Sequence, residues 1–288
     1  MDFQRWQVGD YTLTAVIENE TPGIPPGLFF VGVKEEDVAR HAAWLVPDFA
    51  DARGRVTLRV QAIVVEGRGR RVLVDPCVGN AKARTLPFWN QQHWPFLERL
   101  AAAGLAPERI DLVVHTHLHA DHCGWDTRLE GGEWRPTFRN ARHLYNQAEL
   151  DWIRSDRKTP DNDAVYADSI APIFAAGLAD VVPQELDLGD GLRLEPSPGH
   201  TPGHVSLWIE SQGETALVSG DFLHHPVQCA ELGWAEIGDI DPDQARATRR
   251  RILGRAAETR ALFLGTHFAT RPAGRIEPRG DAFRFIPL

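Results

Sequence analysis

Cysteine and long apolar runs are scarce in this sequence. Its three cysteines, Cys77, Cys123 and Cys229, are odd in number and widely spaced, so we predict no disulfide framework. No apolar run is long enough to cross a membrane, and residues 1–7 contain neither a basic leader nor an apolar stretch of signal-peptide length. We therefore expect a cytoplasmic protein that makes no membrane contact.

Basic residues are also in deficit. Lysine and arginine total 31 against 40 aspartate and glutamate in 288 residues, which gives a formal net charge of −9. This balance argues against a nucleic-acid partner bound mainly through its phosphates. Two short basic clusters, at 68–71 and 249–251, are interpreted as solvated faces. We expect a small molecule, and not a nucleic acid, as the binding partner.

Histidine, in contrast, is concentrated in one place. Residues 115–122 are His-Thr-His-Leu-His-Ala-Asp-His, and they follow an apolar, β-branched run at 110–114 that predicts a buried strand. In an extended chain, side chains two residues apart point the same way, so His117 and His119 can converge on one ion. The next turn brings Asp121 and His122 toward a second ion about 3.5–4 Å away, the usual separation in paired-metal hydrolases. These ligand types suit zinc or a similar divalent metal.

Three neighbours of this segment are predicted to support it. His115 still belongs to the strand, so we assign it a packing or ligand-supporting role. Asp75 ends an earlier strand and is predicted to orient one of the histidines. Cys123 follows the segment directly and is interpreted either as a further ligand or as a small buried thiol beside the site.

Further ligand candidates come just after predicted strands in the second half of the chain. They are His200, Asp221 and His267. His200 lies in a turn rich in glycine and proline, 198–203, and such a rigid turn suits a ligand that has to be aimed. The second histidine of that turn, His204, is interpreted as a hydrogen-bonded structural residue.

The predicted elements form two halves of similar design. Strands followed by helices in each half favour an α/β fold of the αββα type, a sandwich of two sheets flanked by helices, with residues 1–288 as a single domain. Helices are expected at 96–103, 147–155 and 242–258. Strands are expected at 11–18, 56–66, 71–75, 110–114, 142–145, 192–195, 205–210, 215–219 and 261–264.

Residues 20–52 do not follow a strand or helix pattern. This segment is rich in proline and glycine and then in aromatic residues, and it is too long for a simple connection, so we interpret it either as a lid or interface segment or as a loop packed on the core. A homodimer built through this segment is a hypothesis of the same kind. A second aromatic segment, 86–96, could form another wall of a pocket, and aromatic walls favour a hydrophobic substrate.

Taken together, these motifs resemble those of the metallo-β-lactamase-fold hydrolase superfamily. The signature His-x-His-x-Asp-His is met at 117–122, and the later family motifs are met at Pro198–His204, Ser219–Asp221 and Gly265–His267. The resemblance implies two metal sites, filled by two Zn²⁺ or by another divalent metal such as Mn²⁺, Co²⁺ or Fe²⁺. The ligands it assigns are His117, His119 and His200 to one metal, Asp121, His122 and His267 to the other, and Asp221 to both.

Within that superfamily, the chain looks most similar to the quorum-quenching lactonases and to relatives of methyl parathion hydrolase. Many acyl-homoserine lactonases have a substrate-contacting tyrosine three residues after the bridging aspartate, and this chain has His224 there. His224 either replaces the tyrosine as a hydrogen-bond donor or packs. The residues predicted to contact substrate are Phe29, Phe30, Trp89, Trp94 and His224.

The resemblance implies hydrolysis by a metal-bridging hydroxide that attacks a lactone or a related ester with a hydrophobic group. Asp121, next to the hydroxide and the leaving group, is the predicted catalytic proton carrier. Alternatives are an organophosphate triesterase or another ester or amide hydrolase of the β-lactam type. A more distant alternative is a mononuclear iron persulfide dioxygenase, which the metal content would distinguish.

Overall fold

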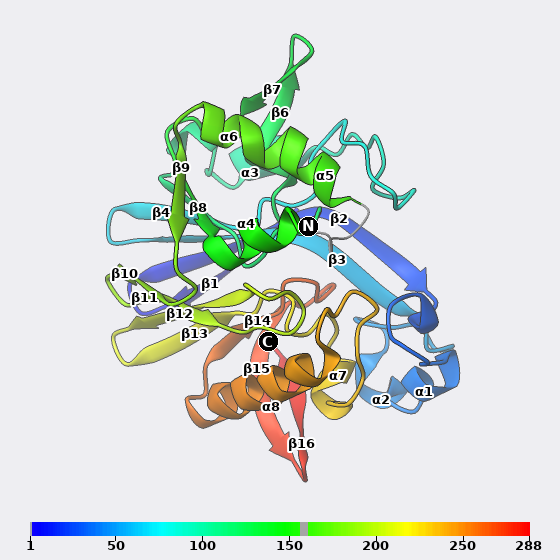
Figure 1. The fold of residues 1–288 in the computed structure, drawn as a ribbon. Helices are drawn as coiled ribbons and strands as arrows, with labels where there is room; N and C mark the ends of the chain where they lie inside the picture. The colour runs from blue at the N-terminus through cyan, green and yellow to red at the C-terminus, as the bar shows by residue number, and fades with distance from the viewer. Residues whose placement is uncertain (1, 156–160) are drawn as a thin grey trace. The chain divides into compact units, whose positions relative to one another are not determined.

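The computed structural model describes residues 2–155 and 161–288, which form two compact units. Of these described residues, the first unit contains 2–19, 60–155 and 161–186, and the second contains 20–59 and 187–288. Each unit contains most of one seven-stranded sheet together with its own helices (Figure 1). The predicted α/β class is therefore confirmed.

The sheet of the first unit mixes antiparallel and parallel strands. Its order is β1-β2-β3-β4-β5-β8-β9, with antiparallel pairs at β1-β2 and β3-β4 and parallel pairs from β4 to β9. Its strands are β1 (Phe3–Val8), β2 (Tyr11–Ile24), β3 (Val56–Gly67), β4 (Arg70–Val74), β5 (Leu112–Val114), β8 (Arg142–Asn146) and β9 (Ala179–Val182). A separate two-stranded hairpin is formed by β6 (Thr127–Glu130) and β7 (Glu133–Pro136). Parallel pairing places the carboxyl ends of β4, β5 and β8 at one edge of the sheet.

Apolar side chains of the first unit pack the helices onto this sheet. Helix α3 (Phe96–Ala102) buries Phe96 and Leu100 against Leu73 and Val113 of the central strands. It stops before Gly104, which adopts a left-handed φ of 78°. The remaining helical segments of the unit are α4 (Gln147–Ile153), α5 (Asn162–Val165), η4 (Tyr166–Ile170) and α6 (Ala171–Ala175), with 3-10 turns η2 (Pro107–Arg109) and η3 (Gly124–Asp126).

The second unit has the same type of construction. Its strand order is β10-β11-β12-β13-β14-β15-β16, and only β13 and β14 pair in parallel. The strands are β10 (Leu186–Gly189), β11 (Leu192–Pro196), β12 (Val205–Ser211), β13 (Glu214–Val218), β14 (Leu262–Leu264), β15 (Ala273–Arg279) and β16 (Ala282–Pro287). The helices are η1 (Pro26–Leu28), α1 (Glu35–Ala39), α2 (Ala42–Leu45), α7 (Val227–Ala230) and α8 (Pro242–Glu258).

Helix α8 begins and packs as its sequence predicts. The side chain of Asp241 accepts a hydrogen bond from the backbone N–H of Gln244 and so caps the helix, while proline occupies the first turn. The helix buries Ile252 and Leu253 in one core with Phe263 of β14, and it contacts β15. This packing fixes the position of β14, which ends three residues before the predicted ligand His267.

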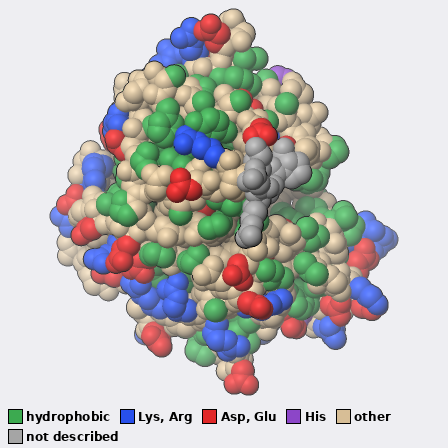
Figure 2. Space-filling view, viewed as in Figure 1, with side chains coloured by type: hydrophobic (Ala, Val, Ile, Leu, Met, Phe, Trp, Pro, Cys, Tyr) green, Lys and Arg blue, Asp and Glu red, His purple; other side chains and the backbone are tan. Residues whose placement is uncertain are grey.

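The basic clusters differ from the prediction at one residue. Basic and acidic side chains are intermingled on the face seen in Figure 2, and Arg68 and Arg71 pair with Asp10 and Glu66. Arg249, however, is fully buried, and its guanidinium donates to backbone carbonyls of 222, 232 and 234. The prediction of a solvated face is wrong for Arg249, because three carbonyl acceptors replace the water it would otherwise bind.

The expected elements are mostly present, with several bounds changed. The hairpin at 56–75, the helices and the strands named from the sequence all occur, although β5 is shorter and β2 longer than expected. Residues 20–52 contain short helices, and Phe30, Leu45 and Phe49 belong to the core of the second unit. The sequence did not predict β1, the β6-β7 hairpin, β9, β10, the helical run 162–175 or the β15-β16 hairpin.

Within the described ranges, no helix is both long and apolar enough to cross a lipid bilayer.

Candidate metal centre

The residues after β5 gather four predicted ligands in the first unit. The Nε2 atom of His117 lies 2.9 Å from Nδ1 of His119, and the rings of His117 and His122 have centroids 4.0 Å apart. Asp121 Oδ2 lies 3.6 Å from His122 Nε2. Ring nitrogens at this separation fit around one cation with metal–nitrogen distances of about 2.0–2.1 Å. The donor set of the first unit therefore fits a zinc-like ion.

Asp75 supports this loop, as the sequence predicted. Its carboxylate accepts hydrogen bonds from the backbone N–H and the hydroxyl of Thr116, both at 2.7 Å, and lies 3.0 Å from Nδ1 of His122. Asp75 adopts a left-handed φ of 54° directly after β4. A carboxylate on the second ring nitrogen of a histidine fixes the tautomer and leaves the other nitrogen for a metal.

Glu149 and Trp152 contact the same loop, and neither was predicted from the sequence. Glu149, in α4, accepts a hydrogen bond from the backbone N–H of Leu118 at 3.1 Å. Trp152, one turn later, packs edge-on against His119 with ring centroids 5.3 Å apart. The helix itself is placed by Asn146, whose side chain caps its first turn. These contacts join residues that are far apart in the sequence, so no local sequence pattern predicts the contacts.

A third buried carboxylate, Glu18 of β2, contacts the loop that follows β4. It accepts hydrogen bonds from the backbone of Val78 and Gly79 at 2.9 and 3.0 Å and from the indole of Trp125 at 2.5 Å. Burial raises the pKa of Glu18 to about 7, although these hydrogen bonds act in the opposite direction. Gly124, beside Trp125, admits no side chain, because a Cβ there would lie 1.7 Å from the carbonyl oxygen of Val78.

The three remaining predicted ligands come together in the second unit. Asp221 Oδ2 lies 3.1 Å from Nε2 of His267 and 3.9 Å from Nε2 of His200. Asp221 follows β13 and His267 follows β14. Since these two strands are parallel neighbours, their carboxyl ends meet at one edge of the sheet. The expectation that ligands follow strand ends is therefore met in both units.

The two histidines of this cluster that are predicted ligands, His200 and His267, each have a partner on Nδ1. His200 Nδ1 lies 3.1 Å from Asp239 Oδ1, and His267 Nδ1 lies 2.7 Å from the carbonyl oxygen of Arg59. Burial alone would raise the pKa of Asp239, but its hydrogen bond and charge interaction with His200 outweigh burial and lower it. The sequence did not predict Asp239 as a supporting residue.

His204 is structural, as predicted. Its Nε2 accepts a hydrogen bond from the backbone N–H of Asp221 at 2.7 Å, so its Nδ1 carries the proton toward Ser197 Oγ, also at 2.7 Å. The second histidine of the 198–204 turn thus fixes the backbone of a predicted ligand.

The predicted substrate contacts have different surroundings. His224 lies within the second cluster, with its Nε2 3.1 Å from Asp221 Oδ2. The ring of Phe29 packs edge-on against the ring of His224, with centroids 5.3 Å apart. Phe30 is fully buried in the core of the second unit. Trp89 and Trp94 are partly buried against the core of the first unit.

Among the predicted substrate contacts, His224 is the one whose side chain, an imidazole, could also bind a metal ion. Its side chain, with those of His200 and Asp221, forms a group whose geometry could hold an ion. Cys123 is fully buried, and its thiol points to the carbonyl oxygen of His119, as expected of a small thiol beside the site.

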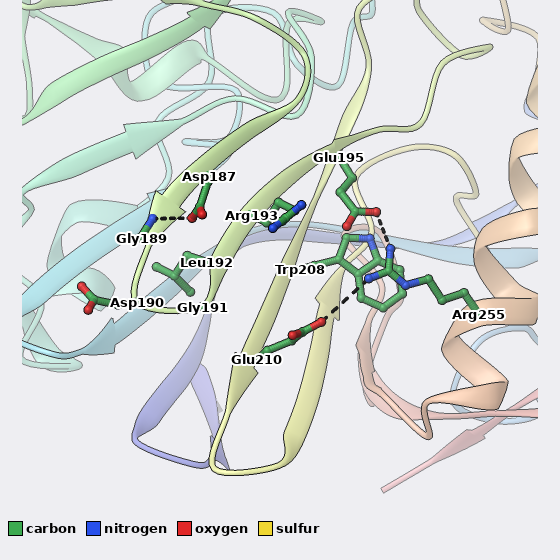
Figure 3. Close-up of a pocket in the computed structure, with 10 residues that line it drawn as sticks. All are labelled: Asp187, Gly189, Asp190, Gly191, Leu192, Arg193, Glu195, Trp208, Glu210 and Arg255. Atoms are coloured by element: carbon green, nitrogen blue, oxygen red, sulfur yellow. Dashed lines mark hydrogen bonds and ion pairs between the residues drawn. The ribbon is translucent and has the colours of Figure 1, made fainter.

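The second unit also contains a pocket formed by β10, β11 and β12 with Arg255 of α8 (Figure 3). The guanidinium of Arg255 lies 3.9 Å over the ring of Trp208 and pairs with Glu195 and Glu210. No predicted ligand is among the described residues that line it. Its lining residues are Asp187, Gly189, Asp190, Gly191, Leu192, Arg193, Glu195, Trp208, Glu210 and Arg255.

Comparison with known proteins adds a family match and distant relatives. A family model described as the metallo-beta-lactamase superfamily matches residues 55–278. A hydroxyacylglutathione hydrolase of Methylococcus capsulatus is 27% identical over 222 residues, which cover 76% of this chain and 66% of the relative. The N-acyl homoserine lactonase AttM of Rhizobium radiobacter is 28% identical over 139 residues, 44% of this chain and 48% of the relative. The chain spans about half to two thirds of the length of such curated relatives.

Two solved structures share the fold over nearly their whole length. The hydrolase AbOPH of the beta lactamase superfamily aligns with a TM-score of 0.83 at 24% identity, covering 100% of this chain and 97% of that one. AidC, a dizinc quorum-quenching lactonase in complex with its product N-hexnoyl-L-homoserine, aligns with a TM-score of 0.83 at 20% identity, covering 99% and 97%. At these identities the likeness shows the fold.

Proposed function

The chain belongs to the metallo-beta-lactamase superfamily, as its motifs predicted, and on that premise we propose that it is a dinuclear metal hydrolase that opens a lactone or a related ester carrying a hydrophobic group. The observation that carries this proposal is the pair of ligand clusters, one after β5 and the other after β13 and β14. Both consist of imidazoles and carboxylates whose second ring nitrogens or backbones are held by dedicated partners.

The ligand assignment follows the family motif residue by residue. One ion would be held by His117, His119 and His200, the other by Asp121, His122 and His267, with Asp221 shared. Zinc is the ion we propose, because imidazole and carboxylate donors suit it. Bound there, two divalent cations would supply a nucleophilic water of lowered pKa and an acid that polarises the scissile carbonyl.

The protein's own contribution to the chemistry is positioning and proton transfer. Water adds to the ester carbonyl carbon, the bond to the ring oxygen breaks, and that oxygen needs a proton. The carboxylate of Asp121 accepts the proton from the attacking water and delivers it to the departing alkoxide. Asp75, Asp239 and His204 hold the surrounding ligands in place, so little reorganisation is required when substrate binds.

The proposed substrate class rests on two supports. Phe29 packs against His224 within the second cluster and offers an apolar surface next to the ligands. Lactonases are also among the curated relatives and the similar structures. Triesters of phosphoric acid are the alternative substrate, because the same centre would polarise a phosphoryl oxygen as it does a carbonyl oxygen.

The test is proton release by the zinc-loaded protein supplied in turn with short-chain lactones, long-chain lactones, phosphotriesters and a glutathione thioester. We expect release from the lactones that increases with chain length and is lost in Asp121→Asn. The matched control is Asp111→Asn, which changes a carboxylate at the opposite end of β5, where it accepts from the backbone of Arg71. Release from phosphotriesters or thioesters alone would reject the lactone, and one bound iron per chain would favour the dioxygenase.

A further inference from the structure

A buried carboxylate behind the first ligand cluster has no place in the chemistry described above. Asp126, in η3, is fully buried, and it lies four residues after His122. Its Oδ2 lies 2.9 Å from Nε2 of His115, which comes two residues before the first predicted ligand. His115 precedes residues 117–122 and Asp126 follows them, so the contact between the two joins the ends of this loop.

The same carboxylate is tied to the neighbouring strand. Nδ1 of His143 lies 3.0 Å from Asp126 Oδ1, and the hydroxyl of Tyr145 donates to Asp126 Oδ2 at 2.7 Å. His143 and Tyr145 are two residues apart on β8, so both side chains point to the same face. His115 also reaches β8, since its Nδ1 lies 2.9 Å from the carbonyl oxygen of Leu144.

Three aromatic rings around Asp126 lie nearly parallel and direct their polar atoms at its carboxylate. His115 stacks on Tyr145 with centroids 4.6 Å apart and an angle of 12° between the planes, and the ring of His143 is parallel to that of Tyr145 within 12°. Three parallel rings thus present their edges to one carboxylate. Because both oxygens of Asp126 accept from these edges, the carboxylate is satisfied without water.

We propose that Asp126 is a positioning residue that closes the metal-binding loop 117–122 through its contact with His115 and so pre-organises the ligands for metal. Asp126 differs in this role from Asp75, which lies against a ligand ring itself. It acts through its contact with His115 and through the backbone of the residues that flank the loop. The inference rests on the proposed function, because it presupposes that the loop binds metal.

The double-mutant cycle of Asp126→Asn and His115→Gln tests the contact directly. The zinc dissociation constant of each purified, folded variant is measured by competition with a chromophoric chelator, and folding is checked by circular dichroism and thermal unfolding of the metal-free protein. We expect Asp126→Asn to weaken zinc binding about 10-fold, the lower end of what losing an outer partner of a metal ligand costs. His115→Gln should give a similar loss, and the double variant should lose little more than either.

Tyr145→Phe is the matched control, because it removes one donor to Asp126 but leaves the contact with His115 intact. It should bind zinc as the wild type does, and excess zinc should restore turnover in Asp126→Asn with an unchanged KM. Should Asp126→Asn fail to fold, His115→Gln against Tyr145→Phe decides the question in the same way.

Three results would overturn the inference. Equal zinc affinity of wild type and folded Asp126→Asn would contradict only the role of Asp126. Three zinc ions in the wild type against two in Asp126→Asn would show that the cluster is itself a metal site and not a closure of the loop. A wild-type protein that binds no zinc would contradict the proposed function, and this inference with it.

Discussion

Single buried carboxylates organise much of the first unit, and each has its own set of donors. Asp75 accepts from Thr116 and lies against His122, Glu149 accepts from the backbone of the ligand loop, and Glu18 accepts from two backbone N–H groups and an indole. Asp75 has a histidine beside it, whereas Glu18 has no cationic or histidine partner among the described residues. Only neutral donors compensate the charged form of Glu18, and burial therefore raises its pKa.

The pH dependence of stability should reveal Glu18. Its folded pKa of about 7 lies above the ordinary value of 4.5, so the folded protein holds the proton where the unfolded chain has lost it. The stabilisation is complete below pH 4.5 and is lost as the pH rises through 7. This difference corresponds to roughly 3 kcal/mol of unfolding free energy.

The measurement is chemical denaturation of the metal-free protein from pH 4.5 to 8, compared with Glu18→Gln, whose amide does not titrate. We expect the wild type to lose roughly 3 kcal/mol relative to the variant over this range. Curves that run parallel at all pH values would show that Glu18 is ionised throughout and that its pKa is not raised.

The loop between α7 and α8 is the element that positions His200. Its backbone is bonded to the 20–52 segment, with Ile237 N–H donating to Phe29 O, and to the turn of His200, with Ile240 N–H donating to His200 O. Asp239 in this loop then reaches the ring of His200. The loop therefore holds His200 in a fixed position relative to the 20–52 segment.

We expect Asp239→Asn to weaken zinc binding by about 10–100-fold, because an amide holds the ring of His200 less firmly than a carboxylate. Asp243→Asn is the control, since its side chain is 93% exposed and pairs only at the surface with Arg246. Zinc affinity is compared by chelator competition. A loss in Asp243→Asn as large as in Asp239→Asn would mean that general charge, and not the contact with His200, sets the affinity.

The sequence predicted those strands and helices in which the order of apolar and polar residues within the element indicates which residues are buried. The β-branched run before His117 is a strand that pairs in parallel with both neighbours and buries both faces. Helix α8 begins after Asp241 because the side chain of Asp241 caps it. The β15-β16 hairpin was missed because it contains Pro278 and several arginines, which disfavour a strand assignment. Pairing with β14 and β16 outweighs that preference.

The supporting residues show the limit of sequence reasoning most clearly. His117, His119 and Asp221 could be proposed as ligands from spacing and motif alone. Glu149 and Asp239 could not, because each reaches the ligand region from a separate element 31 and 39 residues away along the chain. Asp75 was predicted only because it ends a strand, as the ligands do.

Over the whole chain, the predicted ligands fall into two sets that belong to different units. Residues 117–122 belong to the first unit, and His200, Asp221 and His267 belong to the second. Neither set by itself contains the complete ligands of two ions in the proposed assignment. Metal binding should therefore stabilise the chain as a whole, since only the folded state offers both sets.

Both sets should bind one dinuclear centre, and a crystal structure of the zinc-loaded protein with anomalous scattering at the zinc edge would locate the ions. We predict two zinc ions per chain about 3.5–4 Å apart, each with ligands from both sets and with Asp221 between them. A single ion, or two ions each bound by residues of one unit alone, would show that the two sets do not form one dinuclear centre.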